Sequence, residues 1–357
     1  YLDRFPSSQL IRDIINVAYT TEYGLEPDEQ SCLNLLWYIG PESGEFSLYG
    51  TSDERYHIEV VNDQVPQKLA ELLSSSISTG TVLEALREQS DGRYQVTLRS
   101  DGRVTDRTYE RVILALPFTA LRDVAMIMEL PEAKRMAIAT LSNATNTKLI
   151  TAYGDRPWAK RYNSTAAILS DTGFQNSWET SQATYASTPA SLITNYTGGQ
   201  AGLAVENSSA RASAQAFVSQ FDQIFPGVAD THYEGQAIRS SWIGDPFSKG
   251  SYSCYKVGQW TRLYNAPAER LGNLFFIGEH CSWEYAGYME GACETGELAA
   301  LEILEELGIA ESARRQRDRL STYQMARMRQ PHRKPFRQAL LNQQRLRATA
   351  QDLLSKA

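Results

Sequence analysis

The stretch FFIGEHCSWEYAGYMEGACETGELAALEIL, residues 275–304, decides how this chain folds. Its apolar start ends in Gly278-Glu279, which predicts a strand that runs into a turn, and its second half has the pattern of a helix. Gly287 and Gly291 stand where that helix begins, although a glycine inside a helix costs about 1 kcal/mol relative to alanine. The two glycines therefore predict that something approaches the backbone closely at this point.

Outside this stretch, the sequence predicts strands and helices in an irregular order. Apolar spacing predicts helices at 9–24, 31–39, 65–73, 119–140, 209–224 and 288–305. Strands are predicted at 81–87, in a hairpin that turns at 100–102, and at 112–116, 147–153, 190–197, 236–243, 250–255 and 274–277. The run Val112–Leu116 is continuously apolar, which predicts a strand buried on both faces. Because βαβ units do not recur regularly, we expect an α+β (mixed α/β) fold with antiparallel and mixed sheets.

The composition is that of an ordinary globular protein. The chain has 357 residues, enough for two domains, of which 42% are apolar and 22% charged. No apolar run approaches the roughly 18 residues of a membrane span. The first residue is Tyr1 rather than methionine, which we interpret as a trimmed or processed boundary, and no compartment can be inferred.

Charge is distributed unevenly along the chain. Residues 311–357 contain 12 Lys/Arg and 3 Asp/Glu, a net charge of +9, and because the whole chain carries −7, residues 1–310 carry −16. The basic segment predicts a helical tail that packs on the acidic body or on a partner chain. The body has no basic patch interleaved with aromatic residues, so we expect no nucleic-acid partner.

Cysteine and histidine residues do not show the spacing of a metal site. Four cysteines and four histidines are scattered, and no C-x-x-C pair occurs. We therefore expect no metal, and thiols that are free and mostly buried. The cysteines are Cys32, Cys254, Cys281 and Cys293, and the histidines are His57, His232, His280 and His332.

Three segments resemble the flavin-containing amine oxidase family, which includes monoamine oxidases, polyamine oxidases and L-amino-acid oxidases. They are VILALP at 112–117, WIGDPFSKGSYSCYKVGQW at 242–260 and NLFFIGEHCSWEYAGYMEGACETGELAA at 273–300. The third segment is the most specific, and the resemblance spans roughly residues 30–305.

The resemblance implies a partial FAD-binding domain and a substrate domain. Residues 1–60 would be the helical part of the substrate domain, 61–118 part of the FAD-binding domain, and 119–260 the substrate domain. Residues 261–310 would supply the flavin-contacting strand and helix of the FAD-binding domain, and 311–357 the basic helical tail.

The resemblance also implies the cofactor site. The turn would bring backbone and a carboxylate to the phosphate–ribityl chain of FAD, and the helix start would direct N–H groups at the flavin, whose anionic reduced form they stabilise. The implied cofactor-binding residues are Val82, Trp242, Gly278, Glu279, Gly287, Tyr288 and Met289, with Gly291 also allowing close approach. FAD would be noncovalent, because Ser251 stands where covalently linked monoamine oxidases have a cysteine.

Candidate catalytic and substrate-binding residues follow from the same comparison of motifs. Tyr252 and Tyr288 match an aromatic pair beside the flavin, a cage whose π faces suit an amine. Lys148 matches a lysine that holds a water near the flavin. Trp242 would wall the pocket or pack in the core, as would Trp260. Tyr196 falls where some L-amino-acid oxidases place a tyrosine that meets the substrate carboxylate.

Two departures from the family pattern stand out. Val60-Val61 replaces a glycine pair that lies close to the cofactor in the family, and no G-x-G-x-x-G motif occurs in the chain. That motif normally cradles the ADP pyrophosphate. Three interpretations stay open: one chain of a processed multi-chain oxidase, a truncated chain, or a chain that no longer binds flavin.

The implied function is oxidative deamination of an L-amino acid to the 2-oxo acid, ammonia and hydrogen peroxide, with dioxygen as acceptor. The alternatives are oxidation of a primary amine or polyamine, or a non-catalytic chain of a multi-chain assembly. Beyond the small-molecule substrate, we expect a companion chain or N-terminal segment that carries the rest of the FAD site, and a homo-oligomer.

Overall fold

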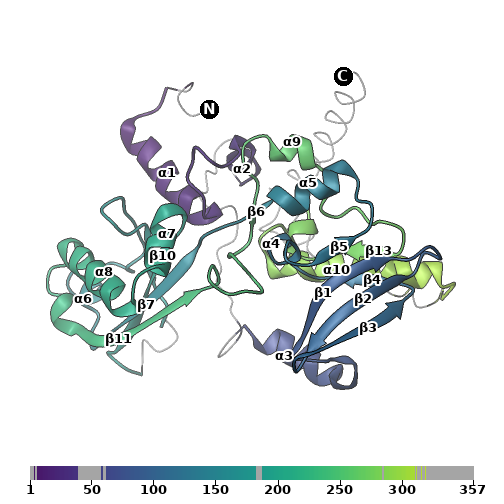
Figure 1. Cartoon of the computed structure of the whole chain (residues 1–357). Helices are drawn as coiled ribbons and strands as arrows, with labels where there is room; N and C mark the ends of the chain where they lie inside the picture. The colour runs from purple at the N-terminus through teal and green to yellow at the C-terminus, as the bar shows by residue number, and fades with distance from the viewer. Residues whose placement is uncertain are drawn as a thin grey trace.

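Figure 1 shows two lobes that lie side by side, one around a five-stranded sheet and one around a four-stranded sheet. The structure is a computed structural model. It describes residues 4, 6–38, 58, 62–181, 187–283, 285–309, 311, 315 and 318. The mixture of helices with antiparallel and parallel strands confirms the α+β class that the sequence predicts.

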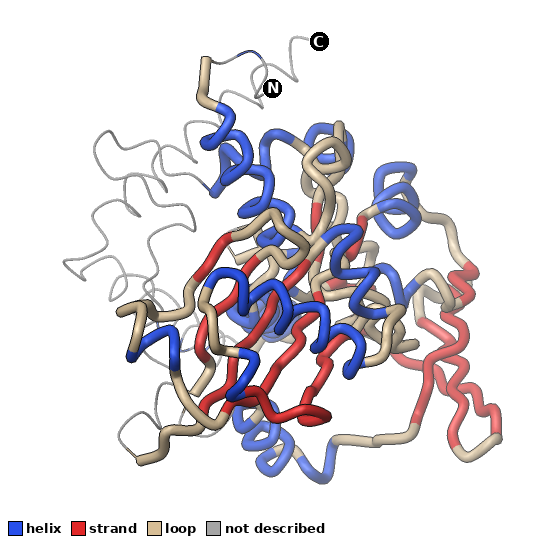
Figure 2. Tube along the Cα trace, turned by 90° about the vertical axis from the view of Figure 1, so that its left-hand side faces the viewer, coloured by secondary structure: helices blue, strands red, loops and turns tan. Residues whose placement is uncertain are grey.

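The first lobe is built on an antiparallel sheet with the strand order β11-β7-β10-β9-β8. The strands are β7 (Thr147–Tyr153), β8 (Ile168–Leu169), β9 (Asn176–Glu179), β10 (Ser191–Thr197) and β11 (His232–Ser241). Helix α8 (Ala210–Ile224) packs on this sheet, and Figure 2, which faces this lobe, shows helices lying across its strands. Its core includes Leu149, Tyr153, Trp158, Ile193, Phe217 and Phe221.

The second lobe combines two sheets. The larger has the order β3-β2-β1-β5, in which β1–β3 are antiparallel and β5 runs parallel to β1. The smaller pairs β4 with β13 in parallel. The strands are β1 (Thr81–Glu88), β2 (Tyr94–Ser100), β3 (Arg103–Tyr109), β4 (Val112–Leu114), β5 (Ala125–Ile127) and β13 (Leu274–Phe276). The helices are α3 (Gln64–Leu72), α4 (Phe118–Leu121), α5 (Glu132–Thr140), α9 (Gln259–Leu263) and α10 (Met289–Glu306).

Short elements connect the lobes. Helix α1 (Gln9–Tyr23) begins at Ser8, whose hydroxyl accepts from Ile11 N at 3.3 Å, and ends at Gly24 in the left-handed conformation. Strand β6 (Ser142–Asn143) leads from the second lobe into the first and pairs with β12 (Ser253–Cys254). The remaining helices are α2 (Cys32–Tyr38), and α6 (Pro157–Lys160) and α7 (Gly199–Glu206), which both pack in the first lobe.

Most predicted elements are present, and two predictions are wrong. Residues 119–140 are not one helix, because β5 separates α4 from α5 and Pro131 precedes the second helix. The run Val112–Leu116 forms a strand only to Leu114, and Ile113 is 44% exposed rather than buried. Within the described residues β4 pairs with β13 alone, and the Ile113 side chain is left partly open.

The structure tests the predictions for the cysteines and leaves those for Val60-Val61, the basic tail and the domain boundaries untested. All four cysteines are free, as predicted, but Cys32 and Cys293 are exposed, so the thiols are not mostly buried. Val60-Val61 and nearly all of the basic tail lie outside the described residues. The domain boundaries stay a prediction. None of the helices in the described part of the chain combines the length and apolar character that a membrane crossing needs.

Candidate active site

The start of α10 presents backbone donors at the surface. Helix α10 begins after Tyr288 without a side-chain cap, and Tyr288 and Met289 are both more than half exposed. The first N–H groups of a helix have no partner within the helix and carry partial positive charge. Gly287 has φ 85°, and a Cβ there would meet nothing closer than the Tyr252 ring at 3.7 Å. The N-terminus of a helix in this state can bind an anionic group.

Gly291 is required for a different reason from the one the sequence suggests. A Cβ at this position would lie 2.4 Å from the Tyr285 carbonyl oxygen and 2.9 Å from Ser282 Cβ. The close approach is therefore made by the turn that precedes the helix, and the prediction that this glycine serves the cofactor ring is not needed to explain it.

Glu279 ties three parts of the site together. Its carboxylate accepts from the Ser253 amide at 2.8 Å, the Ser253 hydroxyl at 2.8 Å and the Gly287 amide at 2.6 Å. Burial raises the pKa of Glu279, and these hydrogen bonds oppose that rise. Gly278, at φ 131°, donates to Thr295 of α10 at 3.0 Å. The turn therefore fixes the loop that carries Gly287, whereas contact of Gly278 and Glu279 with FAD stays a prediction.

A chain of phenol groups links Tyr252 to the first lobe. The Tyr252 hydroxyl donates to the Glu22 carbonyl oxygen, so its single proton is used there. The hydrogen bond of 2.9 Å between the Tyr196 and Tyr252 hydroxyls must then be donated by Tyr196. Tyr196 pairs with Lys148 across β10 and β7, and Lys148 Nζ lies 5.7 Å from the centre of its ring. Tyr252, Tyr196 and Lys148 are thus brought together as one row.

The remaining predicted site residues, Trp242, Val82 and Trp260, lie in different parts of the fold. The Trp242 side chain is 56% exposed, and its carbonyl accepts from Gly250 N at 3.1 Å, two residues before Tyr252. Val82 is half-buried in β1, a strand of the four-stranded sheet. Trp260 stacks on Tyr255 at 4.3 Å, which supports the core-packing interpretation of this residue.

Ser251 and Cys254 bear on how a flavin could be held. The Ser251 hydroxyl donates to Asn146 Oδ1 at 2.8 Å. Cys254 is buried, and burial raises the pKa of its thiol far above the usual range, so it is not a reactive thiolate. Noncovalent FAD therefore stays the prediction.

Sequence reasoning missed the C-terminal end of α1. The Glu22 carbonyl accepts from the Tyr252 hydroxyl. Tyr23, like Tyr252, packs against the cluster of Leu25, Ala144 and Cys254, and its hydroxyl donates to the Asn34 carbonyl at 2.8 Å. One signal was available, because Glu22 is an acidic residue in the last turn of a helix, where the dipole disfavours negative charge.

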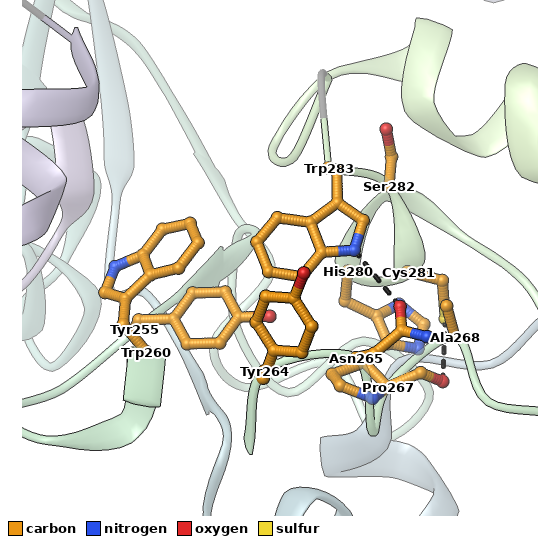
Figure 3. A pocket seen from close by; sticks show the side chains of 10 residues that line it. All are labelled: Tyr255, Trp260, Tyr264, Asn265, Pro267, Ala268, His280, Cys281, Ser282 and Trp283. Atoms are coloured by element: carbon orange, nitrogen blue, oxygen red, sulfur yellow. Dashed lines mark hydrogen bonds between the residues drawn. The ribbon is translucent and has the colours of Figure 1, made fainter. Parts of the chain in front are cut away.

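Figure 3 shows a second aromatic region, beside α9, that does not have the room for a substrate. Its cavity of about 10 Å³ holds at most one water molecule. Ten residues line it: Tyr255, Trp260, Tyr264, Asn265, Pro267, Ala268, His280, Cys281, Ser282 and Trp283. In the figure, the Trp283 indole points to the Asn265 side chain, to which it donates at 3.2 Å.

Three titratable groups at this region, Lys134, His280 and Cys281, have pKa values that burial shifts. Burial lowers the pKa of Lys134 to about 8, while its Nζ donates to the Pro267 carbonyl at 2.9 Å and lies 3.7 Å from the centre of the Phe276 ring. Burial, with the nearby Lys134 charge, lowers the pKa of His280 to about 4. Burial raises the pKa of Cys281 to about 12, so its thiol stays protonated and is not a nucleophilic thiolate at neutral pH.

The start of α10 is where the resemblance places the ring end of a flavin. Tyr288 and Met289 are exposed at this uncapped helix start, Trp242 is exposed as well, and the Tyr252 ring lies near Gly287. Contact of these residues with a flavin stays a prediction. No group of three or more His, Cys, Asp or Glu side chains that could hold a metal ion occurs among the described residues.

The family follows from comparison with known proteins. Residues 27–304 match the family described as flavin containing amine oxidoreductase. The chain therefore belongs to this family, as the three motifs predict, and the cofactor of the family is FAD.

Individual relatives agree with this assignment. Amine oxidase [flavin-containing] A of Sus scrofa is 24% identical over 82% of this chain and 54% of its own length. Polyamine oxidase 3 of Oryza sativa subsp. japonica is 29% identical over 62% of this chain and 44% of its own length. The chain thus spans about half the length of the curated relatives it matches.

Solved structures share the fold. Cyclohexylamine oxidase from Brevibacterium oxydans superimposes with a TM-score of 0.69 at 18% identity, covering 86% of this chain and 67% of that one. A putrescine oxidase variant gives a TM-score of 0.70 at 16% identity, covering 85% and 66%. At these identities the likeness concerns the fold alone.

Proposed function

We propose that this chain forms the substrate-facing part of an FAD-dependent amine oxidase. The observation that carries the proposal is the meeting of the exposed start of α10 with Tyr252 and Tyr288. The net reaction converts an amine, dioxygen and water into a carbonyl compound, ammonia and hydrogen peroxide. FAD, when bound, supplies the acceptor for the two electrons that leave the substrate.

The residues of this chain would orient the substrate and shape the electrostatics. Tyr252 and Tyr288 would keep water away and offer π faces to the amine. The start of α10 would place partial positive charge where negative charge develops. Lys148, which stands beside the Tyr196 ring, would supply the positive charge that assists reduction of dioxygen.

The substrate class is less closely defined than the reaction class. The sequence motifs predict an L-amino acid, with a primary amine or polyamine as the alternative. The names of the relatives above refer to amine, polyamine, cyclohexylamine and putrescine oxidases, which supports the alternative. We therefore take an amine as the proposed substrate and keep the L-amino acid as its competitor. A companion chain and a homo-oligomer stay predictions.

A peroxide assay tests the proposal. The purified chain, with any polypeptide that copurifies, is incubated with a panel of monoamines, diamines, polyamines and L-amino acids, and hydrogen peroxide is measured. We expect peroxide in equal amounts to ammonia with at least one amine. Peroxide from L-amino acids alone would restore the first sequence prediction. No peroxide from any member would contradict the oxidase function and favour a non-catalytic chain.

A further inference from the structure

Glu279 joins the two segments that carry the candidate tyrosines. It lies in the turn after β13, whereas Tyr252 directly precedes β12 and Tyr288 directly precedes α10. Its Oε1 accepts from the Ser253 amide at 2.8 Å, and its Oε2 accepts from the Ser253 hydroxyl at 2.8 Å and the Gly287 amide at 2.6 Å. Ser253 follows Tyr252 and Gly287 precedes Tyr288, so one carboxylate holds the chain neighbours of both tyrosines. We call these three hydrogen bonds the Glu279 clamp.

Tyr252 is held at two points, of which the Glu279 clamp is one. Its hydroxyl donates to the Glu22 carbonyl and accepts from the Tyr196 hydroxyl at 2.9 Å. Its main chain is fixed through Ser253, which gives both its amide and its hydroxyl to Glu279. The ring is therefore restrained at both ends.

Tyr288 follows a residue whose backbone needs a restraint. Gly287 has φ 85°, a conformation that residues with a Cβ rarely adopt, and glycine loses more conformational freedom on folding than any other residue. The bond from its amide to a carboxylate removes part of that freedom, and such charge-assisted bonds are roughly twice as strong as neutral ones. A Cβ on Gly287 would lie 3.7 Å from the Tyr252 ring, so the Glu279 clamp acts where the two tyrosine segments meet.

We propose that Glu279 is a positioning residue, which sets the separation and the relative orientation of the Tyr252 and Tyr288 rings. The sequence motifs assign this residue to the FAD site, whereas the role proposed here acts through the two tyrosines on the placement of the amine. The inference rests on the proposed function, in which these rings orient the substrate. Placement matters for the rate, because a shift of about 1 Å in a reacting group can cost about 100-fold.

The two half-reactions of a Glu279→Gln variant test the role. The substitution keeps the size of the side chain but replaces one acceptor oxygen by an NH2 group, which cannot accept a hydrogen bond. With FAD saturating, we expect reduction of the flavin by an amine to slow about tenfold, and reoxidation by dioxygen to stay unchanged. Weaker FAD binding with an unchanged rate of reduction at saturating FAD would assign Glu279 to the cofactor alone and overturn the proposal.

Ser253→Ala is a milder second variant. It removes one of the three hydrogen bonds and leaves the carboxylate in place, so it should slow the same half-reaction about threefold, the scale of one hydrogen bond. An unchanged rate of reduction in both variants would overturn the proposal.

A double-variant cycle shows whether Glu279 acts through the tyrosines. Tyr288→Ala removes one of the two rings, and because this side chain is 52% exposed the change should leave folding intact. In that background Glu279→Gln should add little further slowing, since residues that act through one another have non-additive effects. Independent effects of the two substitutions on the rate of flavin reduction would overturn the proposal.

Hydrogen exchange tests the Glu279 clamp without turnover. In Glu279→Ala the Ser253 and Gly287 amides lose the same acceptor, so peptides containing them should both exchange faster. A rise in one peptide alone would overturn the clamp. Faster exchange in both, with no peroxide from any amine, would keep the clamp and reject the oxidase function.

Glu26→Ala is the matched control for the exchange experiment. The Glu26 carboxylate also accepts from a backbone amide, that of Gln200, at 2.8 Å. Its loss should speed exchange at Gln200 and leave the Ser253 and Gly287 peptides unchanged. Equal rises at Ser253 and Gly287 in this control would indicate general loosening of the protein and contradict a specific clamp.

Discussion

Replacing Arg156 by methionine is expected to lower the free energy of unfolding by about 3–5 kcal/mol. Arg156 and Glu179 form an ion pair with 2.7 Å between Nε and Oε1, and their side chains are only 4% and 1% exposed. Trp158 also donates to Glu179, at 3.2 Å. Removing the arginine leaves a buried carboxylate without its cation, and the cost of desolvating that charge is no longer offset. Chemical denaturation of both proteins measures the difference.

Two further variants show whether the loss of stability comes from the buried ion pair. Lys160→Met removes the exposed pair of Lys160 with Asp155 and should cost less than about 1 kcal/mol. The double variant Arg156→Met/Glu179→Leu should recover part of the lost stability, because no unpaired charge stays buried. A loss below about 1 kcal/mol in Arg156→Met would show that the pair does not hold α6 to β9 in the five-stranded sheet.

Lys148→Met is expected to slow reoxidation of the reduced flavin by dioxygen about 100-fold, the scale of losing one preorganised charge in a site. Reduction by substrate should change far less, because the side chain acts on the oxygen step in the proposed function. Stopped-flow absorbance follows each half-reaction separately. The charge stands beside the Tyr196 ring rather than in the core, so the substitution should leave folding intact.

Lys148→Arg is the conservative comparison for this residue. It keeps the positive charge and should retain most of the reoxidation rate. Equal slowing of both half-reactions by Lys148→Met would remove the role assigned to this lysine. Equal slowing in both variants would instead indicate that the shape of the side chain matters more than its charge.

The sequence predicts the parts of the site that lie in continuous motifs. Tyr252, Tyr288 and Gly287 stand in two segments whose pattern is local, and the structure brings Tyr252 and Gly287 together. The contact between Glu22 and Tyr252 joins residues 230 positions apart, so no local pattern reveals it. Sequence reasoning therefore singled out the tyrosines, whose role stays a prediction, and did not single out the end of α1.

Two other differences between sequence and structure have equally particular causes. Gly291 signals a close approach, but only the turn geometry shows that the approaching atom is the Tyr285 carbonyl. Ile113 belongs to an apolar run that is typical of a central strand, yet β4 has β13 as its one strand neighbour within the described residues. An apolar run indicates that a strand can be buried on both faces. Whether it is buried depends on the elements that pack against it.

The central claim is that the start of α10 with Tyr252 and Tyr288 forms the ring end of a flavin site. The visible absorption spectrum of the purified protein, with any copurifying polypeptide, tests it most directly. We predict the absorption band of oxidised flavin, lost on adding an amine without dioxygen and regained on admitting air. A colourless protein that takes up no added FAD would contradict the claim.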